Sequence, residues 1–242
     1  MLCARGNAGV KQLYDPDRLK YPLLRKGARG EGKWQRLSWD EALDHAAEQF
    51  DNDSLEKIFM QANINFSQPV LVELVIVPFL QKLGHMWQEG NMRIAQEHAA
   101  SSVVRTFLGR LISSVRFHDQ GPSFISATLS GVHHEFGAMI VALTAAAQGW
   151  NSHYLGANLP VEEIAFSAQK LKAKVIALSI VYPPGDAGME EQLLNLRSVV
   201  SEHITLIVGG SSVESYRKVL ENIGAIISTD MKSLREHLGT LR

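Results

Sequence analysis

Residue types suited to holding a metal-centred group occur at two places in the chain. His134 lies in the segment 130–137 (SGVHHEFG), between a candidate strand and a candidate helix, and Gly137 follows it three residues later. A neutral imidazole is a good donor to a transition metal, and a histidine on a strand-to-helix turn projects above the edge of a sheet. Earlier, Trp87 is followed after nine residues by Glu97-His98. Together these residues predict a metal-centred cofactor held by a helical part and an α/β sheet.

Each pattern taken alone also has an ordinary structural interpretation. His134 with Gly137 is typical of a solvent-exposed loop, and Trp87 with Glu97 is typical of a bundle-core tryptophan beside a surface acid. Their occurrence together, in an order suited to one site, favours the cofactor interpretation. A hydrolase built on Ser179 is disfavoured because the sequence has no Gly-x-Ser-x-Gly elbow around it.

The element that positions His134 is a predicted parallel sheet in residues 122–242. Short apolar runs alternate there with amphipathic segments, which is the pattern of crossover units. Five strands and five helices predict a flavodoxin-like doubly wound sheet, whose ligand lies beyond the carboxyl ends of the strands. The strands are expected at 124–129, 152–155, 175–181, 205–208 and 225–227, and the helices at 138–148, 161–171, 189–201, 213–222 and 231–238.

The elements that position Trp87 and Glu97 are four predicted helices in residues 37–118. Ser38 and Glu41 form a capping-box pattern that begins the first helix. Apolar residues then recur at three- and four-residue spacing. The helices are expected at 38–50, 54–66, 67–90 and 94–115. This part is predicted to be a four-helix bundle, so the fold class is all-α followed by α/β.

Residues 1–36 are expected to form an irregular basic arm. They contain nine Lys or Arg residues against three acids and are rich in glycine, with little periodicity. The whole chain carries a net charge of −1, which gives no overall bias toward nucleic acid or membrane. Cys3 is the only cysteine, so neither a disulfide within the chain nor a thiolate cage can form, and a cytoplasmic location is expected. The most apolar stretch, 70–80, is too short to span a bilayer.

Residues from about 52 to 240 resemble the cobalamin-binding region shared by methionine synthase, corrinoid methyltransfer proteins and light-responsive repressors of the CarH type. His134 and Gly137 match the family's loop motif, in which the histidine is the lower axial ligand of cobalt. The segment 179–181, with Ser179 and Val181, resembles the family's serine-containing segment beside the nucleotide tail. Gly209 and Gly210 resemble its paired glycines, where a side chain would obstruct that tail. The segment 154–156 is similar to the family's second strand and the turn after it.

The helical part resembles the cap of the CarH-type photoreceptors. Trp87, Glu97 and His98 match the family's pattern of tryptophan, nine residues, glutamate and histidine, and Ile94 falls where a small apolar residue packs against the upper ligand. The resemblance implies that these residues enclose the adenosyl group of adenosylcobalamin. Adenosylcobalamin is therefore the expected cofactor, with methylcobalamin and hydroxocobalamin as alternatives.

Two positions depart from the family's pattern. The acidic residue that orients the ligating imidazole is replaced by Val132, which leaves Glu135, Ser130 or a backbone carbonyl to take that part. The histidine that takes the upper cobalt position after photolysis is replaced by Gln88, which leaves His85, His98 or water.

The start of the chain resembles a different family. Residues 1–45 are similar to the start of molybdopterin oxidoreductases, after their iron–sulfur cysteines. Only Cys3 of the cluster ligands is present, so no cluster can be built and the arm is expected to have no redox chemistry.

The resemblance implies a cobalamin-dependent sensor, most closely a photoreceptor or regulator, and not an enzyme. The alternatives are a corrinoid methyl carrier of a methyltransferase system and a cobalamin storage or transport protein. Expected partners are cobalamin and either further copies of the chain or a signalling protein. No membrane partner is expected, and the absence of a recognisable helix-turn-helix argues against direct DNA binding.

Overall fold

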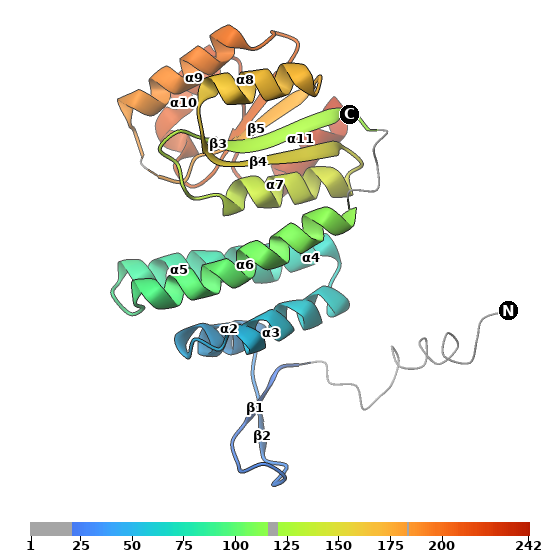
Figure 1. The fold of residues 1–242 in the computed structure, drawn as a ribbon, viewed down its shortest axis with the longest axis vertical. Helices are drawn as coiled ribbons and strands as arrows, with labels where there is room; N and C mark the ends of the chain where they lie inside the picture. Colours follow the sequence, from blue (N-terminus) through green and yellow to red (C-terminus); the bar gives the residue numbers. More distant parts are fainter. Residues whose placement is uncertain (1–20, 116–120, 183) are drawn as a thin grey trace, which may run out of the picture. The chain divides into compact units, whose positions relative to one another are not determined.

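The computed structural model describes residues 21–115, 121–182 and 184–242. The chain divides into two compact units, Met1–Val104 and Arg105–Arg242, and helix α6 (Ile94–Val115) crosses the division (Figure 1). The sequence placed the change from helical part to sheet domain near residue 120, at the end of this helix. The N-terminal residues 1–20 of the predicted arm lie outside the described residues.

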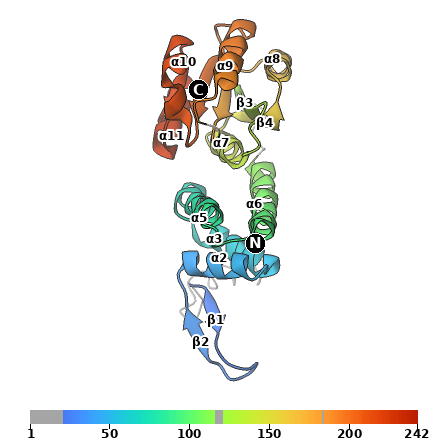
Figure 2. The same cartoon turned by 90° about the vertical axis from the view of Figure 1, so that its left-hand side faces the viewer.

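The first unit begins with an antiparallel hairpin that the sequence did not predict. Strands β1 (Leu23–Arg25) and β2 (Trp34–Arg36) pair with Leu24 opposite Gln35. The Arg25 guanidinium lies 5.2 Å from the centroid of the Trp34 ring, an exposed cation–π contact. Figure 2 shows this hairpin extending from the first two helices of the same unit. The described part of the arm is therefore a regular element.

Four helical segments follow, as predicted. Helix α2 (Trp39–Glu48) begins with the expected capping box: the Glu41 N–H donates to Ser38 Oγ at 3.1 Å, and the Ser38 N–H donates to Glu41 Oε2 at 2.7 Å. Helix α3 (Asn52–Asn65) begins two residues before the predicted Ser54, because Asp51 caps it by accepting from the Ser54 N–H at 3.0 Å.

The third predicted helix is continuous but contains a π-helical turn. It consists of α4 (Gln68–Leu71), the π turn η1 (Val72–Ile76) and α5 (Val77–Gln88). The turn ends two residues before Pro78, which has no N–H to donate to the carbonyl four residues earlier. Its defining bond is the Val77 N–H donating to the Val72 carbonyl.

The apolar stretch 70–80, which was expected to be too short to span a bilayer, lies within this helix. The helix as a whole is long and apolar enough to cross a membrane, by length and composition only. Gln68–Gln88 has 21 residues, and its best 18-residue window has a mean hydropathy of 1.3. One such helix is weak evidence for a membrane segment, because the core helix of a soluble protein meets the same condition. Its apolar side buries Leu71, Val72, Val75, Ile76, Phe79 and Leu83.

The second unit is a doubly wound parallel sheet, as predicted. Its strand order is β4-β3-β5-β6-β7, and every neighbouring pair is parallel. The strands are β3 (Ser123–Leu129), β4 (Asn151–Leu159), β5 (Val175–Ser179), β6 (Thr205–Gly209) and β7 (Ile226–Ser228). The helices are α7 (Phe136–Ala147), α8 (Val161–Lys170), α9 (Ala187–Val199), the 3-10 turn η2 (Val213–Tyr216), α10 (Arg217–Asn222) and α11 (Met231–Leu241).

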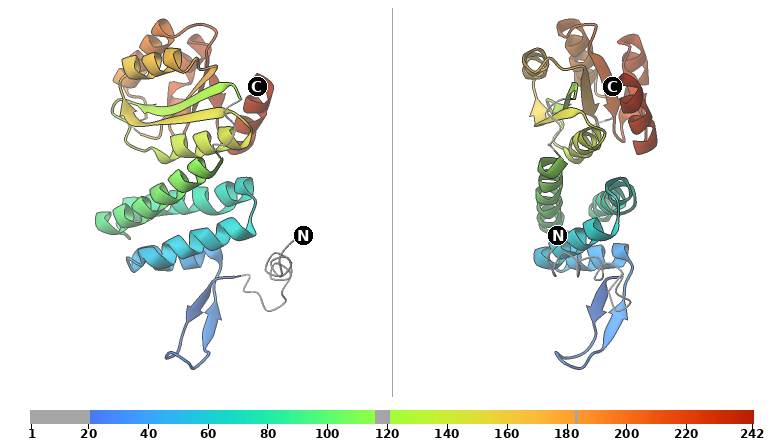
Figure 3. Two further views of the ribbon diagram at one scale, coloured as in Figure 1. Left: turned by 45° about the vertical axis from the view of Figure 1, so that its right-hand side comes forward. Right: turned by 90° about the vertical axis from the view of Figure 1, so that its right-hand side faces the viewer.

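Alternation along the strands divides the core between the two faces of the sheet. In β3, Ile125 and Ala127 pack in the cluster that contains residues of α8, α9 and α10, whereas Phe124 packs in the cluster that contains residues of α7 and α11. Figure 3 shows helices against both faces. Residues of β5 and β6 in register with Phe124 therefore face α7 and α11.

The edge strand β4 is longer than predicted. The sequence placed a turn at Gly156, but the strand continues to Leu159. Gly156 has φ +113°, and the register between β3 and β4 shifts after Ser126. The glycine therefore forms a bulge inside the strand instead of ending it. The bulged segment carries Asn158 to the loop that follows β3.

Candidate functional site

The loop that carries His134 connects β3 to α7, and three other elements hold its first half. Thr128 Oγ1 donates to the Val132 carbonyl at 2.5 Å and accepts from the Asn158 N–H at 2.9 Å. The Gly131 N–H donates to Asn158 Oδ1 at 2.8 Å, and Gln192 Nε2 on α9 donates to the Ser130 carbonyl at 3.2 Å. The loop is therefore fixed from β3, β4 and α9 before it reaches the histidine.

His134 itself is exposed, at the carboxyl edge of the sheet. Within the described residues its imidazole makes no hydrogen bond or ion pair, so both ring nitrogens are available to an outside partner. Val132 is fully buried in the α8–α9 side of the core. The position where the family has an acid is thus a core position here.

Glu135 follows His134 and does not contact it. Its Oε1 accepts from Arg105 Nε, and its Oε2 accepts from the Tyr154 hydroxyl. Burial and the hydrogen bond to this carboxylate raise the pKa of Tyr154 well above its ordinary value of 10.0. Of the substitutes expected for the missing acid, Glu135 is therefore occupied elsewhere, and the Ser130 carbonyl already accepts from Gln192.

Small and polar residues line the α7 side of the sheet beside this loop. Ser179 ends β5 and is 3% exposed, and its Oγ has no hydrogen-bond partner among the described residues. Gly137, in the first turn of α7, lies directly against it: a Cβ on Gly137 would be 2.2 Å from Ser179 Oγ. A buried hydroxyl without a partner costs free energy unless a ligand completes it.

The paired glycines lie at the end of the neighbouring strand and have a packing reason of their own. A Cβ on Gly209 would be 2.7 Å from the Ser228 carbonyl oxygen, and one on Gly210 would be 2.3 Å from the Ile180 carbonyl oxygen. Gly210 also has φ +112°, which side-chain-bearing residues rarely adopt. The carbonyl of Val181, beyond the end of β5, accepts from Ser212 Oγ at 2.6 Å.

In the first unit, the turn between α5 and α6 exposes two large apolar residues. The side chains of Trp87 and Ile94 are 47% and 58% exposed. Gly90, with φ +76°, ends α5 by donating from its N–H to the Trp87 carbonyl at 3.1 Å. The Arg93 N–H donates to Gln96 Oε1 at 2.9 Å at the start of α6. Backbone hydrogen bonds at the end of α5 and at the start of α6 thus fix the positions of Trp87 and Ile94 on either side of the turn.

Glu97 is fixed on the first turns of α6. Its Oε2 lies 2.5 Å from His98 Nδ1, and its Oε1 accepts from Ser101 Oγ at 2.5 Å. Ser101 is buried, whereas the His98 side chain is 74% exposed. The carboxylate orientation is therefore set within the helix. Gln88 and His85 are both exposed.

The predicted site residues form two groups, each within one unit. The second unit gathers six of them at the carboxyl edge of β3, β5 and β6: His134, Gly137, Ser179, Val181, Gly209 and Gly210. The first unit gathers four at the α5–α6 turn: Trp87, Ile94, Glu97 and His98. The residues in the second unit fit a metal-bearing ring with a polar tail. They provide an available imidazole, a buried hydroxyl without a partner among the described residues, and closely packed glycines.

Sequence reasoning missed the residues that hold the loop. Arg105, Thr128, Tyr154, Asn158 and Gln192 come from four elements and have no shared motif. Asn158 has φ +59°, and asparagine tolerates this conformation better than most residues, but its position after a bulge could not be read from the pattern.

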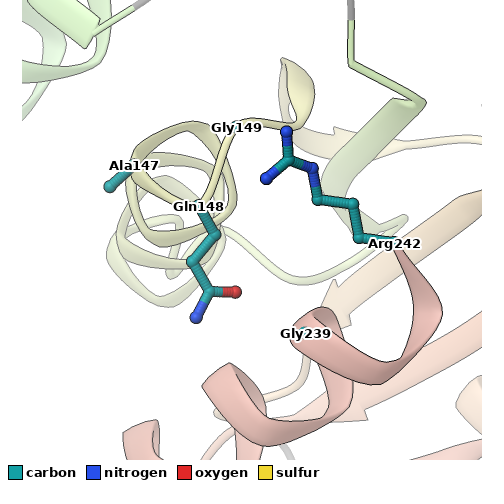
Figure 4. Close-up of a pocket in the computed structure, with 5 residues that line it drawn as sticks. All are labelled: Ala147, Gln148, Gly149, Gly239 and Arg242. Carbon is teal, nitrogen blue, oxygen red and sulfur yellow. The ribbon is translucent and has the colours of Figure 1, made fainter.

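Two further features bear on where a ligand could lie. A hollow of about 470 Å³ is lined by Ala147, Gln148, Gly149, Gly239 and Arg242, at the C-terminal end of α7 (Figure 4). It contains none of the predicted site residues, and His134 lies before the other end of that helix.

Among residues 21–115, 121–182 and 184–242, no group of three or more His, Cys, Asp or Glu side chains could hold a bare metal ion. A metal carried in its own ring needs only one donor from the protein.

Two sequence families match most of the described chain. One family described as B12 binding domain matches residues 122–230, and a second family with the same description matches residues 39–112. The HTH-type transcriptional repressor CarH of Myxococcus xanthus is 24% identical over 207 residues, which cover 85% of this chain and 68% of that protein.

A solved structure shares the fold, and a short stretch matches an unrelated enzyme. The Methanosarcina barkeri monomethylamine corrinoid protein superposes with a TM-score of 0.67 and 15% identity, covering 82% of this chain and 96% of that one. At this identity the likeness shows the fold alone. The perchlorate reductase alpha subunit of Dechloromonas aromatica is 59% identical over 46 residues, which are 19% of this chain and 5% of that protein.

Proposed function

We propose that the chain is an adenosylcobalamin-dependent sensor, because residues 122–230 and 39–112 each match a family described as B12 binding domain. The observation that carries the proposal is the exposed His134 imidazole on a loop fixed from three elements. A fixed loop places a ligating nitrogen without the entropy cost of ordering it on binding.

On this proposal the second unit holds the lower side of the cofactor. His134 would hold the cobalt, and Ser179 Oγ, which has no hydrogen-bond partner among the described residues, would donate to the nucleotide tail. Gly137, Gly209 and Gly210 keep side chains away from the tail. Bound adenosylcobalamin supplies a cobalt–carbon bond that light can break.

The first unit takes the upper ligand. Trp87 and Ile94 offer exposed apolar surface of the kind that marks binding sites. Glu97, three residues after Ile94, is held by Ser101 and His98. These side chains would cover the adenosyl group, and they would become exposed to solvent once light had released that group. The change alters self-association or the binding of a signalling protein, in a cytoplasmic protein without catalytic activity of its own.

The proposal is tested by loading the purified chain in the dark with adenosylcobalamin and, separately, with methylcobalamin. Green or blue light should then change both the absorption spectrum and the oligomer size of the adenosylcobalamin-loaded protein. A protein that takes up both forms without discrimination and passes methyl groups to a methyltransferase would be a carrier instead. Binding without either response would indicate storage.

The upper-ligand assignment is tested by a pair of tryptophans with similar exposure. Trp87 is 47% exposed and Trp34, on the hairpin, is 52% exposed. Trp87→Ala should weaken the binding of adenosylcobalamin more than that of methylcobalamin, whereas Trp34→Ala should affect neither. Equal effects of the two substitutions on the two cofactors would refute the assignment.

The lower-ligand assignment is tested by two adjacent histidines. His134→Ala should abolish the spectrum of histidine-ligated cobalamin, and His133→Ala should retain it, since both side chains are exposed and only the first matches the motif. Because His134 makes no hydrogen bond within the described residues, its loss should change the free energy of unfolding of the cofactor-free protein by less than about 0.5 kcal/mol. An unchanged spectrum in His134→Ala would end the proposal.

A further inference from the structure

One ion pair links α6 to the residue next to the proposed cobalt ligand. Arg105 Nε on α6 donates to Glu135 Oε1, and the Arg105 guanidinium lies 5.8 Å from the centroid of the Phe136 ring. The second Glu135 oxygen accepts from the Tyr154 hydroxyl on β4. The carboxylate is 17% exposed and the arginine side chain 53% exposed. Glu135 is therefore a largely buried charge whose only cationic partner among the described residues comes from α6.

Arg105 shares one face of α6 with the residues assigned to the upper ligand. Glu97, Ser101 and Arg105 are spaced by four residues each, so they lie in one row along the helix. The first two are already joined by a hydrogen bond of 2.5 Å.

The other hydrogen bonds of the loop hold only its first half. Thr128, Asn158 and Gln192 hold the segment before His134. On the other side of His134, Glu135 has no capping role at the start of α7, so its side chain is committed to Arg105 and Tyr154.

We propose that Glu135 is a positioning residue for His134, and that its ion pair with Arg105 and the hydrogen bond from Tyr154 hold the second half of the loop. This inference rests on the proposed function and deepens it by naming a residue that positions the ligand of the same site. Without Arg105 the carboxylate keeps Tyr154 alone and the loop around His134 loosens, so His134 would hold the cobalt less firmly.

The test compares Arg105→Ala with Arg93→Ala in the full chain, because Arg93 directly precedes α6 and its guanidinium makes no contact given for the described residues. Hydrogen exchange of residues 130–137 in the cofactor-free protein should accelerate about two- to fivefold in Arg105→Ala, with no change elsewhere in the sheet domain. With hydroxocobalamin bound, the histidine-ligated fraction should fall by a similar factor, and Arg93→Ala should match the unaltered chain in both measurements.

Further variants separate positioning from a general loss of structure. Arg105→Lys keeps a cation within reach of Glu135 and should restore most of the ligated fraction, whereas Glu135→Gln should reproduce Arg105→Ala. The double variant Arg105→Ala with Glu135→Gln should be no worse than either single one. Should Arg105→Ala fail to fold, as judged by circular dichroism, Glu135→Gln carries the same comparison.

The outcomes also distinguish this inference from the proposed function. If the unaltered chain takes up no cobalamin, or shows no histidine ligation, the proposed function itself fails. If it does both, and Arg105→Ala and Glu135→Gln leave loop exchange and ligated fraction unchanged, the positioning role is refuted while the function stands. Exchange that accelerates equally throughout the sheet domain would likewise refute a positioning role.

Discussion

The contact between Gly137 and Ser179 makes a prediction whose size follows from the structure. Gly137→Ala places a methyl group 2.2 Å from Ser179 Oγ and 3.1 Å from Ser179 Cβ. Both distances are shorter than an ordinary van der Waals contact of about 3.5–4.0 Å. Because Ser179 is 3% exposed at the end of β5, its hydroxyl cannot turn into open solvent to make room. The first turn of α7 or the end of the strand must shift.

Two opposed terms set the magnitude. Forcing one methyl group into a packed site costs about 1–3 kcal/mol. Replacing glycine by alanine in a helix gains about 0.5–1 kcal/mol, because alanine loses less backbone entropy. The net loss expected for Gly137→Ala is therefore about 1 kcal/mol of the free energy of unfolding. Gly109→Ala, on α6, is the matched control: nothing lies within 4 Å of its Cβ, so it should gain about 0.5–1 kcal/mol.

Urea unfolding of the cofactor-free protein measures both variants, and their difference of about 2 kcal/mol is the quantity to compare. Ser179→Gly removes the obstructing side chain, so Gly137→Ala should cost less in that background than in the unaltered chain. A Gly137→Ala protein stabilised as much as Gly109→Ala would show that α7 does not lie against β5 as described, and the arrangement of the tail site would have to be abandoned.

Three further predictions concern the residues around the loop. Ser179→Ala should stabilise the cofactor-free protein by about 1 kcal/mol, because it removes a buried hydroxyl that has no partner among the described residues. The same substitution should weaken cobalamin binding about tenfold. Ser126→Ala removes another buried hydroxyl without a partner and should stabilise the protein without weakening binding. The raised pKa of Tyr154 means that unfolding releases its proton once the pH exceeds 10.0, so the free energy of unfolding should fall with rising pH above that value. It should fall less in Tyr154→Phe, as unfolding measured from pH 9 to 11 would reveal. Parallel curves for the two proteins would contradict the hydrogen bond to Glu135. Asn158→Ala should cost about 1–2 kcal/mol in urea unfolding, through two lost loop contacts and a φ of +59° that alanine resists, and an unaffected midpoint would refute its role in holding the loop.

The sequence was sufficient to predict the sheet domain because its signals are local and repeated. Apolar runs such as Val175–Ser179 are buried along their whole length, and the helices between them have one apolar side. The parallel topology also predicted that His134 lies at the carboxyl edge of the sheet, and the structure places it there. The same holds for the capping box at Ser38, where two residues determine the start of a helix.

Features that depend on few residues or on distant partners were missed. The β1–β2 hairpin has three-residue strands, too short for an alternation to be recognised. Gly156 reads as a turn in isolation, and only pairing with β3 makes it a bulge. The Arg105–Glu135 pair joins residues 30 positions apart and exposes most of the arginine, so no periodicity or motif marks it.

The π turn η1 determines where the third helix can change in length without turning Trp87. One π turn takes about one residue more than an α turn, so the additional residue in Val72–Ile76 is absorbed locally and the residues after it keep their direction. Deleting one residue there should restore a regular α-helix with Trp87 on the same side. Deleting one residue from the regular part of α5 before Trp87 would instead rotate that side chain by about 100° relative to the start of the helix. A lineage can therefore shorten the helix at the π turn and keep its tryptophan in place, but not in α5.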